Sequence, residues 1–149
     1  MKLHFEHKAF DALSLRELYD LLWLRDEVFV VGQRITAECE VDGLDPECIH
    51  VLGRDESGSI VATTRLFMQN DPVKVGRVAI HPRLQRQRLG RQLMHYVHEI
   101  MGDRPGKMSA QAYLTDWYTS LGWQALGDIY IEAEIPHQKM LRPAAASAE

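Results

Sequence analysis

The stretch from residue 75 to residue 98 constrains the fold more than any other part of the chain. It opens with an apolar run at 75–80, which predicts a strand, and a loop rich in arginine follows at 83–90. After the loop, apolar residues recur at helical spacing, which predicts a helix over 89–98. The order strand, basic loop, helix directs the free N–H groups of a helix N-terminus beyond the strand end, and such a terminus attracts anions.

The basic loop carries a resemblance to a known family. It reads Gln85-Arg86-Gln87-Arg88-Leu89-Gly90, which resembles the acetyl-CoA-binding motif of the GNAT superfamily of N-acyltransferases: Gln or Arg, two residues, Gly, one residue, then Gly or Ala. Arg88 replaces the first glycine, and a positive φ at that position would cost roughly 1–2 kcal/mol. The alternative is a basic helix N-terminus that binds nothing.

The resemblance implies that the end of the strand and the loop bind acetyl-CoA. In the family, a backbone N–H on this strand also supports the thioester oxygen, which here would be that of Val78. The expected cofactor-binding residues are Val78, Ala79, Ile80, Gln85, Arg86, Gln87, Arg88, Leu89, Gly90 and Arg91.

Length and charge limit the class of protein. The 149 residues suit a single domain, which we expect at 1–142, followed by a flexible Ala-rich tail at 143–149. The formal net charge of −4 argues against a nucleic-acid binder. The sequence contains no run of about 18 apolar residues, so we expect no membrane span. Because the N-terminus lacks a signal-peptide core, we expect a cytoplasmic protein.

Cys39, Cys48 and His50 match no zinc spacing, so we expect no metal.

The remaining pattern predicts an α/β fold. Ser14 and Glu17 form a capping box that starts a helix running to about Phe29, Gly58 marks a hairpin turn, and Gly122 ends a later helix. The other expected elements are strands at 3–7, 50–54, 60–68, 73–80, 107–111, 123–126, 130–134 and 137–141, and a helix at 112–121. This order gives a mixed, mostly antiparallel sheet flanked by helices, which agrees with the GNAT order of elements.

Arg25 is the only charge in the predicted apolar stripe of the first helix. The stripe consists of Leu15, Leu18, Leu22, Arg25 and Phe29. A buried charge needs a partner, so Arg25 pairs either with a carboxylate of the chain or with a carboxylate or phosphate of a substrate. The acidic segment 38–47, Glu132 or Glu134 could supply such a carboxylate. The surrounding region 30–48, which we expect to be a loop with a short helical turn, could admit the substrate. For most of its acidic residues, solvated loop charge is the simpler interpretation.

A second stretch, residues 111–123, also resembles the family. Its Trp117-Tyr118 pair and Gly122-Trp123 step fit the GNAT pattern, which implies that the hydroxyl of Tyr118 lies near the sulfur of CoA. A phenol, with a pKa near 10, can hydrogen-bond to the departing thiolate, whose pKa is about 8.5. Full proton transfer is not downhill, so Tyr118 is the candidate catalytic residue either as a proton donor or as a hydrogen-bond stabiliser. The alternative is a core tyrosine that packs on the sheet.

Three further segments, 25–33, 41–43 and 135–140, resemble the ElaA subgroup of GNAT proteins. The subgroup usually has Glu where this chain has Gly32, a departure that bears on the substrate. We assign Arg25 and His137 to acceptor binding. The base that takes the proton of the amine is left open among Glu38, Glu40, Asp42, Glu132, Glu134 and His137.

These features predict an N-acetyltransferase that uses acetyl-CoA as cosubstrate. The acetyl group would pass by direct attack to an amine of a small molecule or a protein. The rival interpretations are a non-catalytic acyl-CoA-binding regulatory module and an acyl-homoserine-lactone-type synthase, which shares the fold. We expect an amine acceptor as partner, no nucleic acid and no membrane, with a homodimer left open as an assembly.

Overall fold

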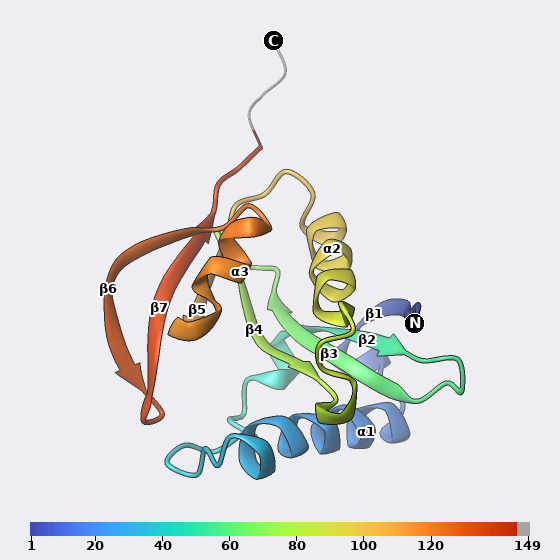
Figure 1. The fold of residues 1–149 in the computed structure, drawn as a ribbon. Helices are drawn as coiled ribbons and strands as arrows, with labels where there is room; N and C mark the ends of the chain where they lie inside the picture. The colour runs from blue at the N-terminus through green and yellow to red at the C-terminus, as the bar shows by residue number, and fades with distance from the viewer. Residues whose placement is uncertain (146–149) are drawn as a thin grey trace.

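A seven-stranded sheet forms the centre of the computed structural model, which describes residues 1–145 (Figure 1). The strand order is β1-β2-β3-β4-β5-β7-β6, and all neighbours are antiparallel except β4 and β5. The strands are β1 His4–Ala9, β2 Ile49–Arg54, β3 Ile60–Phe67, β4 Val73–Ile80, β5 Gly106–Gln111, β6 Gln124–Glu132 and β7 Ile135–Arg142. The predicted mixed, mostly antiparallel sheet is confirmed.

Helices cover the two faces of the sheet. The α-helices are α1 Leu15–Arg25, α2 Leu89–Met101 and α3 Thr115–Ser120, and a π-helix, η2 Asp26–Gly32, continues α1. The apolar sides of α2 and α3 enter one core cluster, and that of α1 enters a second cluster on the other face. Short 3₁₀ turns occupy Phe10–Ala12, Asp45–Glu47, Pro82–Leu84 and Ala112–Leu114. Within residues 1–145, no helix has the length and apolar character needed to cross a membrane.

The start of α1 agrees with the sequence, but its buried face does not. The amide of Glu17 donates to Ser14 Oγ at 3.0 Å, and the amide of Ser14 donates to Glu17 Oε1 at 2.9 Å, as the capping box predicts. Leu15, assigned to the buried stripe, is 89% exposed. The buried positions lie mostly one residue earlier than predicted, about 100° around the helix. They are Leu21, Leu24, Arg25 and Val28.

Several element boundaries also differ from the prediction. The first strand begins at His4 and runs to Ala9, where it pairs with β2. The two segments expected at 123–134 form one strand, β6, whose pairing with β7 shifts register between Leu126 and Tyr130. The predicted tail at 143–149 lies partly outside the described residues; within them, the amide of Ala145 donates to the carbonyl of Asp103 at 3.1 Å.

The separation of β4 from β5 creates the site. The two strands pair only at their beginnings, where Val73 faces Gly106 and Lys74 faces Lys107. Further along, β4 carries a bulge opposite β3, and Arg77 within it has a φ of 52°. The divergence of β4 and β5 is visible in Figure 1. Because the strands part, β4 does not continue its ladder on that side, and a gap opens in the middle of the sheet.

Candidate active site

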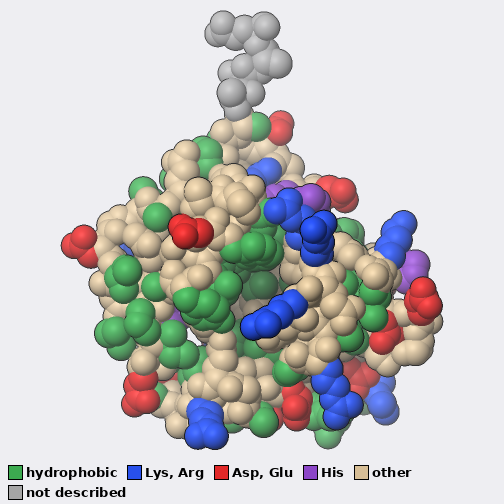
Figure 2. All heavy atoms as spheres, in the orientation of Figure 1, with side chains coloured by type: hydrophobic (Ala, Val, Ile, Leu, Met, Phe, Trp, Pro, Cys, Tyr) green, Lys and Arg blue, Asp and Glu red, His purple; other side chains and the backbone are tan. Residues whose placement is uncertain are grey.

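A cleft of about 1060 Å³ lies where β4 and β5 separate. One wall comes from β4 and the loop before α2, the other from β5 and α3, and η2 with the segment at 38–44 contributes to the lining. Figure 2 shows the cleft as a hollow lined with hydrophobic side chains, with Lys or Arg side chains at its edge. A mainly apolar concavity with a few polar groups is typical of a small-molecule or cofactor site.

Two arginines of the basic loop have left-handed backbone conformations. Arg88, the N-cap of α2, has a φ of 61°, and Arg86 has a φ of 70°. The chain therefore uses arginine in the conformation that favours glycine. At Gly90 a Cβ would lie 3.2 Å from Cη2 of Trp117, so the glycine allows α3 to pack against the start of α2. These features bring the first turn of α2 to the cleft.

Most of the predicted cofactor-binding residues line the cleft. They are Val78, Ile80, Gln85, Arg86, Arg88, Leu89, Gly90 and Arg91. Ala79 does not: its side chain is buried in the core cluster beneath α1, because successive side chains of a strand point to opposite faces. Gln87 is not part of the lining either.

Tyr118 lies in the cleft wall and in the core at once. It is 4% exposed and forms edge-to-face contacts with Trp117 and Trp123, with ring centroids 4.9 and 6.5 Å away. Burial raises the pKa of the Tyr118 phenol, and the nearby Tyr113 raises it further. The hydroxyl therefore keeps its proton at neutral pH and is available as a donor.

Arg25 lies outside the cleft lining. Its side chain is 1% exposed, and its guanidinium contacts Glu40 at 2.6 Å and Asp45 at 2.7 Å. The structure thus favours the pairing with carboxylates of the chain over the substrate contact, because these two residues already use its donors. The physical reason for the correction is that segment 38–47 folds back over the end of α1 and supplies the partners.

Arg25 belongs to a larger network that fastens the acidic segment to the sheet. Arg65 on β3 contacts Asp42 at 2.6 Å and Asp45 at 3.1 Å, and Arg77 contacts Glu40 at 2.8 Å. The Arg65 guanidinium holds the pKa of Asp42 well below its usual range. Much of the segment's charge is therefore neutralised rather than solvated. Arg65, a cation within an apolar strand, was the available sequence signal for this network.

The two cysteines lie in different environments. Cys39 is exposed at the cleft, and Cys48 is buried, with its thiol donating to the carbonyl of Leu44 at 3.4 Å. Among the described residues, no three or more His, Cys, Asp or Glu side chains are grouped to hold a metal ion.

Two glutamines that the sequence did not single out join the walls of the cleft. Gln33, which ends η2, donates to Gln111 Oε1 at 3.0 Å, and Gln111, which ends β5, donates to Gln33 Oε1 at 2.8 Å. The residues are 78 positions apart, so no local pattern could have paired them. The reciprocal bond ties the helical side of the cleft to β5.

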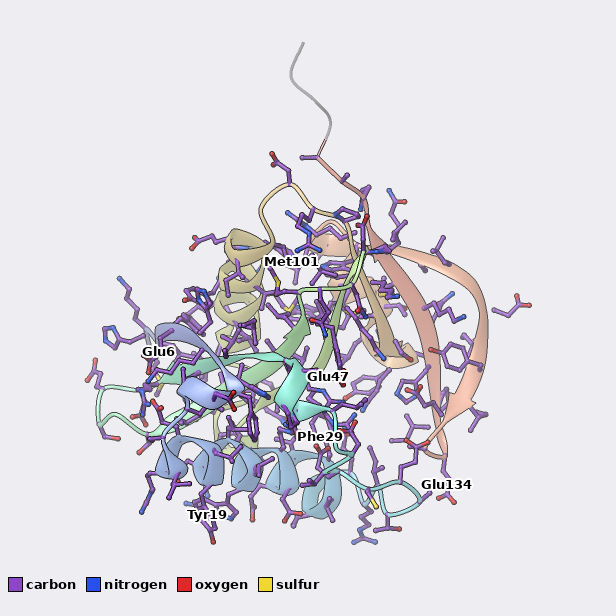
Figure 3. The ribbon with its side chains drawn as sticks, turned by 180° about the vertical axis from the view of Figure 1, so that it is seen from behind. Glu6, Tyr19, Phe29, Glu47, Met101 and Glu134 are labelled. Carbon is purple, nitrogen blue, oxygen red and sulfur yellow. The ribbon has the colours of Figure 1, made fainter. Side chains whose placement is uncertain are left out.

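The base candidates separate once they are placed in the fold. Glu38, Glu40, Asp42, Glu132 and His137 line the cleft, whereas Glu134 does not. Figure 3 shows Glu134 at the tip of the β6–β7 hairpin. His137 lies on β7 and is 7% exposed, directly opposite Gln111 of β5.

Comparison with known proteins agrees with this geometry. The family model described as an acetyltransferase (GNAT) domain matches residues 27–142. The chain belongs to the GNAT acetyltransferase family. Membership supports acyl transfer as the class of activity.

Relatives and solved structures narrow the resemblance within this GNAT family. ElaA of Escherichia coli is 36% identical over 87% of this chain and 90% of that protein, and its crystal structure superposes with a TM-score of 0.85. A UPF0039 protein of Schizosaccharomyces pombe is 37% identical over 93% of this chain and 95% of its own length. An acyl-CoA N-acyltransferase structure from Pseudomonas aeruginosa is 37% identical, with a TM-score of 0.84 over 95% of this chain and 99% of that one. The predicted resemblance to ElaA is confirmed.

Proposed function

We propose that this GNAT protein transfers an acetyl group from acetyl-CoA to an amine by direct attack. The observation that carries the proposal is the cleft between β4 and β5, which ends at the basic left-handed loop and the first turn of α2. Peptide groups along a separated strand suit the amides of a pantetheine arm, and a helix N-terminus suits a pyrophosphate. The Pseudomonas aeruginosa relative, described as an acyl-CoA N-acyltransferase, supports an acyl-CoA donor.

The cleft holds groups suited to each part of this reaction. When the amine attacks the thioester carbonyl, negative charge develops on the carbonyl oxygen, and the backbone N–H of Val78, beside the bulge of β4, is our candidate donor to it. As the C–S bond breaks, Tyr118, which keeps its proton, can donate to the thiolate. Both groups line the same cleft.

The acceptor is an amine of a small molecule or of a protein. We propose that it enters between the segment at 38–44 and the β6–β7 hairpin, because Glu38 and Glu132 line the cleft from these two elements and favour a cationic ligand. The acyl-homoserine-lactone synthase and the non-catalytic module are not favoured, since the match to the GNAT domain spans residues 27–142 and the site retains its acid candidate. The cytoplasmic location, the absence of a nucleic-acid or membrane partner and the homodimer stay predictions.

A panel of amines with acetyl-CoA tests the proposal. We expect at least one alkyl amine to release free CoA thiol, detected with a disulfide reagent, and to form the acetylated amine, detected by mass spectrometry. Thiol release without an acetylated amine would indicate hydrolysis, and binding of CoA without turnover of any amine would favour the regulatory module.

The place of the pyrophosphate is tested separately by calorimetry. Gly90→Asp adds a negative charge at the start of α2 and should weaken acetyl-CoA binding by at least tenfold, because it repels the phosphates. Ser57→Asp adds the same charge in the exposed β2–β3 turn and should leave the affinity unchanged. Equal affinity of Gly90→Asp and Ser57→Asp would remove the pyrophosphate from the loop.

A further inference from the structure

We propose that His137 is the general base of the reaction and that Glu132 positions it and stabilises its protonated form. This inference rests on the proposed function and adds the group that takes the proton of the acceptor. His137 lines the cleft and is more than nine-tenths buried, so its ring is held at a surface that an acceptor can reach.

The other candidates are less suited to accept a proton. Glu40 and Asp42 each contact two arginines, so guanidinium donors already occupy their carboxylate oxygens. Glu134 is not part of the cleft lining. Glu38 lies at the exposed rim of the cleft, where its carboxylate is solvated. His137 and its neighbour Glu132 are the candidates that combine access to the cleft with a fixed geometry.

The hydrogen bonds of His137 fix which nitrogen can act. Nδ1 lies 2.7 Å from the carbonyl oxygen of Ile135, and because a carbonyl only accepts, Nδ1 carries a proton. In the neutral ring Nε2 therefore carries the lone pair that can accept a proton. Nε2 lies 3.4 Å from Oε2 of Glu132. Once Nε2 takes a proton, the imidazolium faces a carboxylate, which stabilises the charge.

Glu132 is itself held by neighbouring strands. Ser109 Oγ on β5 donates to Glu132 Oε2 at 3.1 Å, and the same hydroxyl contacts the hydroxyl of Tyr130. The Tyr130 ring stacks on His137, with centroids 6.3 Å apart. The Glu132 side chain is 44% exposed, which gives the proton a route to solvent. Glu132 and Nε2 of His137 therefore lie together at the cleft, where an ammonium group can donate to both, while the carbonyl of Ile135 holds the opposite nitrogen of the ring.

The charged groups around His137 come from the hairpin and its own strand. On β6 it faces Glu132 and Tyr130, and on β5 it lies opposite the uncharged Gln111. Along β7, Lys139 lies two residues further and shares a face with His137. Glu132 is thus the charge in direct contact with the ring.

The step balances in protons and electrons. An alkylammonium loses one proton to His137 Nε2, directly or through one water, and this proton passes to solvent. The freed nitrogen lone pair forms the C–N bond with the thioester carbon, and the C–S bond breaks, with its electron pair leaving on sulfur. The nitrogen then loses its second surplus proton to solvent, while the thiolate, which accepts a hydrogen bond from Tyr118, takes a proton from solvent. The products are an amide and CoA thiol.

Acceptors of different basicity distinguish a base from a structural histidine. His137→Gln should lower kcat/KM about 10²–10³-fold with an alkyl amine, which is almost fully protonated at pH 7.5. An amine whose conjugate acid has a pKa below 6 needs no deprotonation before attack, so the same variant should lose less than about tenfold with it. His4→Gln, an exposed histidine on β1, is the matched control and should leave both rates unchanged.

Glu132→Gln tests the positioning role with the same two amines. Without the carboxylate the protonated ring loses its counter-charge, so kcat/KM should fall at least tenfold with the alkyl amine and much less with the weakly basic amine, while acetyl-CoA affinity measured by calorimetry stays the same. Equal losses with both amines, in Glu132→Gln or in His137→Gln, would overturn the assignment. A wild-type protein that acetylates neither amine would overturn the proposed function and the base with it; wild-type turnover that His137→Gln preserves would overturn the base alone.

Discussion

Replacing Arg25 by glutamine tests the buried network more directly than any other change. The substitution removes the cation that contacts Asp45 at 2.7 Å and Glu40 at 2.6 Å and leaves both carboxylates in place. Breaking a buried ion pair on one side costs about 3–5 kcal/mol, because the remaining charge stays buried. Each carboxylate keeps a second arginine, Arg65 at 3.1 Å or Arg77 at 2.8 Å. We therefore expect the lower end, about 3 kcal/mol of unfolding free energy.

Urea unfolding followed by tryptophan fluorescence measures this loss. For a chain of this length, about 3 kcal/mol corresponds to a fall in Tm of roughly 6–12 °C. Arg16→Gln is the matched control: Arg16 pairs with Asp20 at 3.1 Å, but its side chain is 84% exposed. An exposed pair of this kind is worth about 0.3–0.5 kcal/mol, so the control should be almost neutral.

Acidification gives the same prediction a second readout. Arg25 and Arg65 lower the pKa of Asp45 below its ordinary value of 3.8, against the opposing effect of burial. A carboxyl with a lowered pKa contributes stability that is present above the unfolded pKa and is lost as pH falls through the folded one. The difference between wild type and Arg25→Gln should therefore shrink below about pH 4. A loss as small as that of Arg16→Gln, or a raised KM at unchanged stability, would refute the structural role and return Arg25 to the site.

Three further changes test the cleft and the core. Tyr118→Phe should keep acetyl-CoA affinity and lower turnover about 10²-fold, since it removes the donor to the thiolate; an unchanged rate with a measured acceptor would reduce Tyr118 to packing. Arg88→Gly should raise the unfolding free energy by about 1 kcal/mol in urea titrations, because it relieves a φ of 61°, whereas Arg91→Gly within α2 should lower it by about as much. Burial lowers the pKa of His98, whose Nε2 accepts from the indole of Trp123 at 3.0 Å, to about 4. Stability should therefore be full above about pH 6.5 and fall toward pH 4, and His98→Gln should flatten this slope in Tm measured against pH.

The order of the elements could be predicted because its signals are local. The capping box at Ser14, the glycine of the β2–β3 turn and the helical spacing after Arg88 each act within a few residues, and each element appears in the structure. The predictions that were wrong concern features that depend on contacts with elements distant in the sequence. The buried face of α1 is rotated because β3 and β4 select it, and the sequence period fixes only that one face is buried.

The same distinction between local and distant contacts applies to the candidate site. The basic loop and Tyr118 could be predicted, because both belong to continuous stretches that resemble the family. The partners of Arg25 and the Gln33–Gln111 bond join segments that are 15 to 78 residues apart. No spacing in a single sequence encodes such contacts.

The acidic side chains of the cleft have different partners in the fold. In the sequence, Glu40, Asp42 and Glu132 are equivalent carboxylates. The fold gives the first two to arginines of α1, β3 and β4, which hold the 38–47 segment as a wall of the cleft. Glu132 is left to Ser109 and His137 on the opposite wall. The oxygens of Glu40 and Asp42 accept from guanidinium groups, whereas the side chain of Glu132 stays 44% exposed beside the ring of His137. Packing therefore gives chemically identical carboxylates different roles: Glu40 and Asp42 hold the cleft wall, and Glu132 lies beside His137, the proposed base.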